Sequence, residues 1–170
     1  MYQTPRRILI TGPESSGKST LARTLAWATD GRYVEEVARK YLNQRNGQYA
    51  EADLLDIWRA QMAAQAAAEA EGPNYLFFDT GPEVLEIWAK VKFGRCDPRI
   101  VRSRQRQSYD LVLLCSPDLP WEPDPLREAP DTETRWDLFE AYQKIIGSHR
   151  VIAGAQRVAQ ALAAVRAMED

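Results

Sequence analysis

The sequence has few of the residues that metal centres and covalent catalysis need. Its 170 residues include two cysteines, Cys96 and Cys115, and a single histidine. A zinc site needs several such ligands at close spacing, and a cysteine nucleophile needs a histidine base. The spacing of these three residues supports neither arrangement. We therefore expect no cysteine and histidine metal cluster and no cysteine–histidine active site.

Long apolar runs and an excess of positive charge are also absent. No apolar run approaches the ~20 residues that cross a bilayer, and the first seven residues are too few and too polar for a secretion signal. The net charge of −2 argues against a protein built to hold nucleic acid, which needs a basic surface. We expect a cytoplasmic protein with no membrane or nucleic-acid partner. The oligomeric state stays open, a homo-oligomer included.

A complete phosphate-binding loop is present near the start of the chain. The apolar run Arg7 to Thr11 leads into Gly12-Pro13-Glu14-Ser15-Ser16-Gly17-Lys18-Ser19, which matches G-x-x-x-x-G-K-S. Backbone N–H groups of such a loop form an anion nest, Lys18 reaches the β- and γ-phosphates, and the Ser19 hydroxyl holds magnesium. We therefore predict ATP as co-substrate and Mg²⁺ as cofactor. The predicted ATP-binding residues are Gly12, Glu14, Ser15, Ser16, Gly17, Lys18, Ser19, Thr20, Arg127 and Arg135.

Short apolar runs alternate with helical patterns along the whole chain. Such alternation predicts an α/β fold with a parallel sheet. We predict a P-loop NTPase of three αβα layers, in which residues 1–170 form one domain with a five-stranded parallel sheet. The predicted strands are Arg7–Thr11, Tyr33–Val34, Tyr75–Asp79, Leu111–Cys115 and Arg150–Ala153. The predicted helices include residues 20–26, 50–71, 83–90, 132–146 and 156–168.

The third predicted strand ends in an acid, Asp79. A P-loop protein places at such a position the carboxylate that orients magnesium, directly or through water. Asp79 is therefore our candidate for this role, together with Ser19. The alternative is that Asp79 or Thr80 caps the helix that follows.

An acid and an arginine follow the second predicted strand. Glu36 and Arg39 lie three residues apart and share a helix face, at the carboxyl end of a parallel strand where ligands bind. Glu36 could accept a proton from an attacking hydroxyl or fix a sugar hydroxyl, while Arg39 neutralises phosphate or holds Glu36 in place. An exposed ion pair between the two is the alternative.

A long proline-rich segment follows the fourth predicted strand, and loops of this length are usually functional. Its Arg127, followed by Arg135 on the next helix, fits a lid over about residues 118–135 that closes on the triphosphate. The alternative is a surface loop whose arginines pair with nearby acids. Those acids are Glu128, Asp131 and Glu133.

Two further groups of side chains belong to the predicted ligand face or lie beside it. Trp88 and Trp121 are candidates to stack on a flat base or pyridinium ring. The segment from Lys90 to Arg106 is locally basic. A solvated helix face, with one or two cations near a phosphorylated product, explains this better than nucleic acid, because acidic charge balances the chain elsewhere.

Several of these motifs together resemble the ribosylnicotinamide kinase family, the P-loop kinase module of bacterial NAD-biosynthesis regulators and of stand-alone proteins. The likeness spans nearly the whole chain. It rests on the P-loop with its Glu14-Ser15-Ser16, on Val34 to Leu42, on Phe78-Asp79-Thr80 and on Pro120-Trp121-Glu122-Pro123-Asp124-Pro125-Leu126-Arg127. The regulators also carry nucleotidyltransferase and often DNA-binding domains, for which this chain has no room.

The resemblance implies that the γ-phosphoryl group of ATP is transferred to the 5′-hydroxyl of nicotinamide riboside, giving nicotinamide mononucleotide. Positive groups would spread the developing charge, while Glu36 or Asp79 takes the hydroxyl proton; the sequence leaves open which. The catalytic residues would be Lys18, Glu36, Asp79 and Arg127. The substrate-binding residues would be Glu36, Arg39, Tyr41, Asp79, Trp88 and Trp121.

Two other functions fit the same motifs. The first is another small-molecule P-loop kinase, with a nucleoside or a different riboside as acceptor. The second is a switch that hydrolyses ATP slowly to control a partner, for which the basic segment from Lys90 to Arg106 is the place to look.

Overall fold

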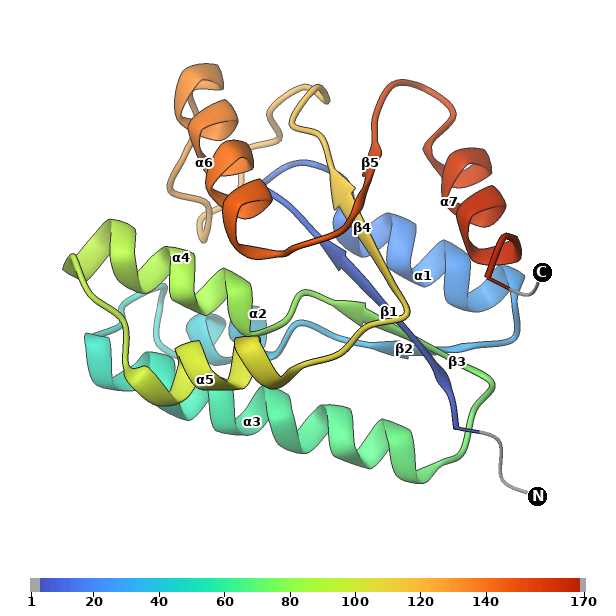
Figure 1. Ribbon diagram of the computed structural model, residues 1–170. Helices are drawn as coiled ribbons and strands as arrows, with labels where there is room; N and C mark the ends of the chain where they lie inside the picture. Colours follow the sequence, from blue (N-terminus) through green and yellow to red (C-terminus); the bar gives the residue numbers. More distant parts are fainter. Residues whose placement is uncertain (1–3, 169–170) are drawn as a thin grey trace.

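The computed structural model describes residues 4–168 and has one five-stranded sheet at its centre (Figure 1). The strands are β1 (Arg6–Thr11), β2 (Arg32–Val34), β3 (Tyr75–Asp79), β4 (Leu111–Cys115) and β5 (Arg150–Ile152). Their order in the sheet is β2-β3-β1-β4-β5, and every neighbouring pair is parallel. The predicted five-stranded parallel sheet is confirmed.

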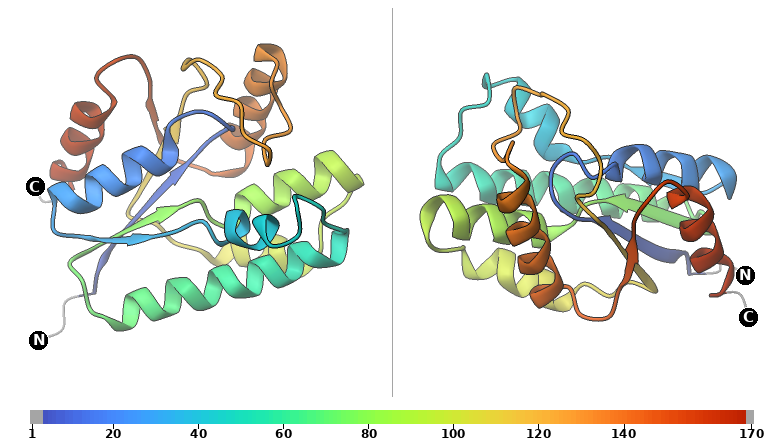
Figure 2. Two further views of the ribbon diagram at one scale, coloured as in Figure 1. Left: turned by 180° about the vertical axis from the view of Figure 1, so that it is seen from behind. Right: turned by 90° about the horizontal axis from the view of Figure 1, so that it is seen from above.

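Helices cover both faces of this sheet, which confirms the three-layer arrangement (Figures 1 and 2). One face carries α1 (Lys18–Ala28) and α7 (Arg157–Arg166). The other carries α3 (Glu51–Ala70), α4 (Pro82–Phe93), α5 (Pro98–Arg106) and α6 (Thr132–Ile145). The short α2 (Val37–Asn43) follows β2.

The alternation of side chains along the strands divides the core in two. Ile8 and Ile10 of β1 pack in the cluster that includes Leu25 of α1 and Val165 of α7. Leu9, between them, packs on the opposite face in a cluster with Ala68 of α3. Successive strand residues point to opposite faces, so a sheet buried on both sides needs an uninterrupted apolar run.

Several helix ends follow directly from local chemistry. Proline suits the first helical turn because its missing N–H needs no partner there, and Pro82 begins α4. Gly94, at φ 71°, ends the same helix in the left-handed conformation that favours glycine. This helix is longer than the predicted 83–90. In α5, Pro98 again occupies the first turn and Asp97 accepts a hydrogen bond from the backbone N–H of Arg99.

The order of the strands fixes where a ligand can bind. The chain adds β2 and β3 on one side of β1 and then β4 and β5 on the other. The carboxyl end of β1 is therefore a switch point, where the loops that follow neighbouring strands diverge and leave a crevice. Among residues 4–168, no helix combines the length and the apolar character needed to cross a membrane.

Candidate active site

A cavity of about 400 Å³ lies at this switch point. The P-loop, the residues after β2 and β3, and the segment between β4 and α6 all contribute to its wall. The predicted site residues that line it are Gly12, Glu14, Ser15, Ser16, Gly17, Lys18, Ser19, Thr20, Glu36, Arg39, Trp88 and Arg127.

The P-loop adopts a conformation that only small or tolerant residues allow. Gly12, Ser15 and Gly17 have φ angles of 139°, 55° and 80°. A Cβ added to Gly12 would lie 2.5 Å from the carbonyl oxygen of Cys115, at the end of the neighbouring strand β4. Glycine at this position is therefore required both by the backbone angle and by the close approach of two strands.

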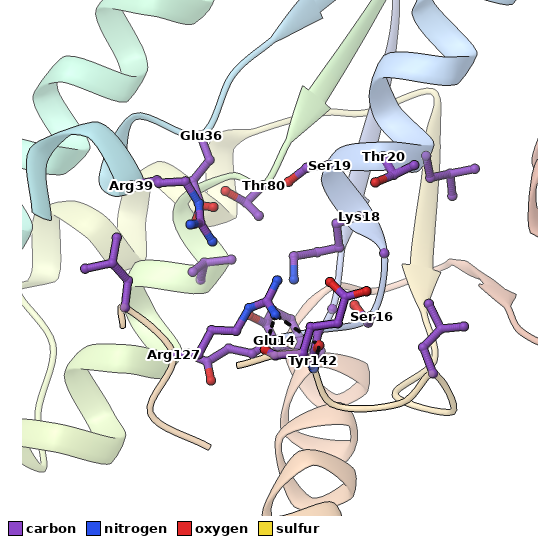
Figure 3. Close-up of a pocket in the computed structure, with 18 of the residues that line it drawn as sticks. Glu14, Ser16, Lys18, Ser19, Thr20, Glu36, Arg39, Thr80, Arg127 and Tyr142 are labelled. Atoms are coloured by element: carbon purple, nitrogen blue, oxygen red, sulfur yellow. Dashed lines mark hydrogen bonds between the residues drawn. The ribbon is translucent and has the colours of Figure 1, made fainter. Parts of the chain in front are cut away.

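Lys18 reaches from the start of α1 into the cavity (Figure 3). Its ammonium group donates a 2.6 Å hydrogen bond to the carbonyl oxygen of Pro13, and the Ser16 hydroxyl donates to the same oxygen at 2.7 Å. These bonds close the loop on itself and place a positive charge beside its concave side.

Glu36 lines the cavity from the end of β2, across from Lys18 (Figure 3). The side chain is half-buried. Burial and the nearby Asp79 carboxylate raise the pKa of Glu36 to about 7, although Lys18 and Arg39 act in the opposite direction. A carboxyl group with a pKa near neutrality can both accept and release a proton at physiological pH.

Asp79 lies behind the cavity wall rather than in it. It is 1% exposed, and its Oδ2 accepts a 2.9 Å hydrogen bond from the hydroxyl of Tyr33. Its Oδ1 is buried and has no hydrogen-bond partner in the part of the chain that the structure describes. The helix-cap alternative for Asp79 and Thr80 is wrong, because Gly81 is the N-cap residue of α4.

Most of the predicted lid, about residues 118–135, belongs to an irregular segment over residues 116–131 between β4 and α6, whereas residues 132–135 form the first turn of α6. Side chains of the P-loop fix this segment by hydrogen bonds. The Glu14 carboxylate accepts hydrogen bonds from the backbone N–H groups of Glu128 and Ala129 at 3.0 and 2.9 Å, and the Ser15 hydroxyl accepts one from Glu122 at 2.9 Å. Glu14 and Ser15, which the sequence predicts as ATP contacts, thus have lid groups as their side-chain partners.

The two arginines of the lid region have different positions. Arg127 lines the cavity and donates a 3.2 Å hydrogen bond to the Ser15 hydroxyl. Arg135 is 3% exposed and does not line the cavity. It donates to the carbonyl oxygens of Glu14, Ser15 and Leu119 at 3.2, 3.0 and 3.1 Å. Arg135 therefore holds the lid against the back of the P-loop, and neither arginine has the ion pairs of the surface-loop alternative.

Arg39 also contacts the lid. Its guanidinium donates a 2.7 Å hydrogen bond to the Asp124 carboxylate, which gives an ion pair between α2 and the lid. The simple Glu36–Arg39 ion pair is not formed, because the partner of Arg39 is Asp124.

Of the aromatic residues that were predicted to contact the substrate, some line the cavity and others do not. Trp88 lines it. Trp121 does not line it, and its ring lies 5.8 and 5.9 Å from the guanidinium groups of Arg127 and Arg135. Tyr41 does not line the cavity either, and its hydroxyl donates a 2.7 Å hydrogen bond to Asp53.

Sequence reasoning missed several residues of this region. Thr80 lines the cavity at φ 68°, an angle that β-branched residues rarely adopt. Tyr142 and Arg157 line it from α6 and α7. No sequence pattern indicates the backbone strain at Thr80. Its position directly after Asp79, however, does indicate that it belongs to the site.

Glu83 is a buried acid that stabilises the edge of the sheet at which the cavity lies. Its Oε1 accepts hydrogen bonds from the Thr11 hydroxyl at 2.8 Å and from the backbone N–H of Gly81 at 2.9 Å. Burial raises the pKa of Glu83, and these two bonds act against the rise. The carboxyl group thus joins the end of β1 to the turn after β3.

Solved structures share this fold. NadR protein in complex with NR matches with a TM-score of 0.75 and 20% sequence identity, over 97% of this chain and 52% of that chain. NadR protein in complex with NAD and AMP-PNP matches at 0.78 and 21%, over 97% and 50%. Deoxyadenosine kinase from M. mycoides with bound dATP matches at 0.57 and 11%, over 95% and 99%. The chain thus spans about half the length of the NadR chains.

The comparisons of sequences gave fewer matches than the comparison of structures. No curated protein matches the chain. Residues 7–152 match the AAA domain family, a range that includes the P-loop, the lid and all five strands except Arg6, the first residue of β1. The chain therefore belongs to the AAA domain family.

Proposed function

We propose that this protein is an ATP-dependent kinase that phosphorylates the 5′-hydroxyl of nicotinamide riboside. The observation that carries the proposal is the pairing, in one cavity, of the P-loop lysine Lys18 with Glu36, a carboxyl group whose pKa is about 7. A phosphoryl transfer to an alcohol needs a positive group at the phosphates and a proton acceptor for the hydroxyl.

In this proposal, two positive side chains interact with the phosphates of ATP. Lys18 and Arg127 both line the cavity, from the P-loop and from the lid. Cations aimed at the equatorial oxygens stabilise the charge that develops as the γ-phosphoryl group leaves ADP. The bond between Arg127 and the Ser15 hydroxyl places the arginine beside the loop that would hold the phosphates.

Glu36 is the group that we assign to the acceptor hydroxyl. It would accept the hydroxyl proton as the oxygen attacks the γ-phosphorus. Asp79 raises the pKa of Glu36 without lining the cavity, which favours Glu36 over Asp79 as the base.

Magnesium fits the remaining groups. Among residues 4–168, no cluster of three or more histidine, cysteine or acidic side chains is arranged to hold a metal ion. Mg²⁺ does not need one, because it is usually held by one or two protein oxygens, several waters and substrate phosphates. The Ser19 hydroxyl would supply one such oxygen, and the unpartnered Oδ1 of Asp79, which lies behind the cavity wall, would orient the ion through water. The ion, when bound, would neutralise charge on the phosphates.

Nicotinamide riboside is the acceptor that the motifs favour. The P-loop, Glu36, Arg39 and the lid of the resembled kinase family all meet at this cavity, and NadR protein in complex with NR has the same fold. The indole of Trp88 in the wall offers a flat surface for a pyridinium ring. The fold of deoxyadenosine kinase, matched over 99% of that chain, makes a nucleoside the second candidate acceptor.

A coupled ADP-release assay with ATP and magnesium tests the proposal. The acceptor panel is nicotinamide riboside, adenosine, deoxyadenosine and water alone, and phosphorus NMR identifies the phosphorylated position. Lys18→Ala and Glu36→Gln should abolish turnover or reduce it at least 100-fold. Tyr41→Phe is the matched control, because that hydroxyl bonds to Asp53 outside the cavity.

The outcomes separate the candidate functions. Turnover with nicotinamide riboside that yields a 5′-phosphate supports the proposal. Turnover with a nucleoside alone keeps the kinase and overturns the acceptor. ADP release that no acceptor stimulates would instead support the switch ATPase.

A further inference from the structure

Tyr142 is a polar residue of the P-loop cavity that takes no part in the proposed proton and phosphoryl transfers. It lines the cavity from α6 (Figure 3), is 3% exposed, and has no hydrogen bond from its hydroxyl to another residue among residues 4–168. Its hydroxyl oxygen is not one of the unpartnered atoms that solvent cannot reach in this part of the chain, as the hydroxyl of Tyr109 is. The small accessible area of Tyr142 therefore includes the hydroxyl, which opens to the cavity.

The packing of the Tyr142 ring does not explain its hydroxyl. The ring belongs to an apolar cluster with Val84 and Ile87 of α4 and with Phe139 of its own helix. Phe139 packs in this cluster with no polar group. Taking a hydroxyl out of bulk water without a hydrogen bond costs free energy, so the Tyr142 oxygen calls for a partner in the cavity.

The same cluster shows on which side of the cavity Tyr142 lies. Trp88, the proposed surface for the pyridinium ring, also packs against this cluster. The Glu36 carboxylate, the proposed base, is close enough to act on the Tyr142 hydroxyl electrostatically. Tyr142 is thus a neighbour of both side chains that we assign to the phosphoryl acceptor.

The Tyr142 hydroxyl acts as a hydrogen-bond donor. Burial and the carboxylates of Glu83, Glu36 and Glu14 raise the pKa of Tyr142, so the phenol keeps its proton at physiological pH. Carboxylates repel phosphate oxygens in a partly buried site. The three acids therefore favour a neutral oxygen, rather than a phosphate, as the partner of the hydroxyl.

We propose that Tyr142 is a substrate-binding residue whose hydroxyl donates a hydrogen bond to the 2′- or 3′-hydroxyl of the riboside. The inference rests on the proposed function, in which the ring of the riboside lies on Trp88 and its 5′-hydroxyl at Glu36. The sugar joins these two parts, and its 2′- and 3′-hydroxyls are the neutral oxygens left to bind. A site built to bond a hydroxyl discriminates against compounds that lack it, so Tyr142 should help to select ribosides.

Isothermal titration calorimetry on the full chain tests this inference without requiring turnover. The riboside is titrated into protein that holds magnesium and a non-hydrolysable ATP analogue. Tyr142→Phe should weaken the Kd of nicotinamide riboside about 3- to 10-fold, the effect of one lost hydrogen bond. With either the 2′-deoxy or the 3′-deoxy analogue, the protein and Tyr142→Phe should bind equally, because that analogue lacks the partner of the hydroxyl. A merely structural role would weaken all three ligands alike.

Tyr109→Phe is the matched control. The Tyr109 hydroxyl is also unpartnered among residues 4–168, but it is buried outside the cavity, so its removal should leave the Kd unchanged. Urea unfolding should show no loss of stability in Tyr142→Phe, because the hydroxyl has no bond within residues 4–168 to lose. The Kd of the ATP analogue should also stay the same.

The outcomes separate this inference from the proposed function. An unchanged Kd for the riboside in Tyr142→Phe, an equal loss with both deoxy analogues, or a weaker Kd for the ATP analogue overturns the role of Tyr142. Riboside binding that depends on Tyr142 without ADP release overturns the kinase and keeps the binding role. If adenosine binds and nicotinamide riboside does not, adenosine and its two deoxy forms take its place. Failure of every riboside to bind overturns both.

Discussion

The guanidinium of Arg39 lies 2.7 Å from the Asp124 carboxylate and joins the helix after β2 to the lid between β4 and α6. Arg39 comes from the element that also presents Glu36 to the cavity. The ion pair therefore links the position of the proposed base to the position of the lid, two segments that lie far apart in the sequence.

Breaking this ion pair should weaken substrate binding with little effect on folding. Arg39→Ala and Asp124→Ala should each raise KM several-fold, because the lid is then no longer held to α2. The double variant should be no worse than either single one. The pair is partly exposed, so the coupling free energy in a double-mutant cycle should be about 0.2–1 kcal/mol. Additive effects of the two substitutions would show that the residues act independently.

Glu36 should give the reaction a pH dependence with a midpoint near 7. The base is active only when it is deprotonated, so kcat/KM should fall about tenfold per pH unit below the pKa of about 7. In Glu36→Gln this acid limb should disappear and the remaining activity should be at least 100-fold lower. Tyr41→Phe serves as the control and should retain the limb. An unchanged limb in Glu36→Gln would assign the titration to the nucleotide.

The raised pKa of Glu36 should also affect the stability of the fold. Activity should rise with pH, whereas stability should fall. The pKa of Glu36 rises from 4.5 to about 7 in the folded protein, so the folded state holds its proton more tightly than the unfolded state. The free energy of unfolding should therefore decrease as the pH rises from about 4.5 to about 7, by about 1–3 kcal/mol. Urea titrations of the protein and of Glu36→Gln measure this contribution, which the glutamine variant should lack.

Arg127 and Arg135 should respond differently to the same substitution. Arg135→Met removes three hydrogen bonds from a buried charged group, so the free energy of unfolding should fall by about 3 kcal/mol or more. Arg127→Met should leave stability nearly unchanged and should lower kcat about 100- to 1000-fold, since Arg127 lines the cavity. Thermal unfolding and steady-state kinetics on both variants separate the roles. Equal losses of kcat at unchanged stability would place both arginines at the phosphates.

The sequence was sufficient for the sheet and for the P-loop, because both depend on local patterns. The apolar run that ends in Asp79 identified β3 and the apolar run Leu111–Cys115 identified β4, both at their observed bounds, and the G-x-x-x-x-G-K-S spacing identified Lys18. The partners of Glu14, Arg39 and Arg135 could not be obtained in this way. Each of them contacts a lid segment 85 or more residues away or, for Arg135, the distant P-loop, and such contacts depend on how the lid folds back over the sheet. Thr80 was missed for a related reason, since its backbone angle is imposed by the packing around it.

The buried pair of Glu86 and Arg104 should be the most important ionic contact for the stability of α4 and α5. Glu86 is 1% exposed and accepts hydrogen bonds from Arg104 at 2.5 Å and from Lys90 at 2.6 Å. Burial alone would raise the pKa of Glu86, but these two cations lower it. Arg104 also donates to the carbonyl oxygen of Ile145 at the end of α6.

Arg104→Met should therefore lower the free energy of unfolding by about 3–5 kcal/mol, because a buried carboxylate loses its principal partner. Lys90→Met is the matched control and should cost less, since the lysine side chain is 53% exposed. Replacing both members of the buried pair, Glu86→Leu with Arg104→Met, should recover most of the loss. The stabilisation should also disappear as the pH falls through the lowered pKa of Glu86. Urea unfolding of the protein and of the three variants at pH 7 and at pH values lowered stepwise below 4.5 measures both effects, and a double variant no more stable than Arg104→Met would show that the bond to Ile145 carries the stabilisation.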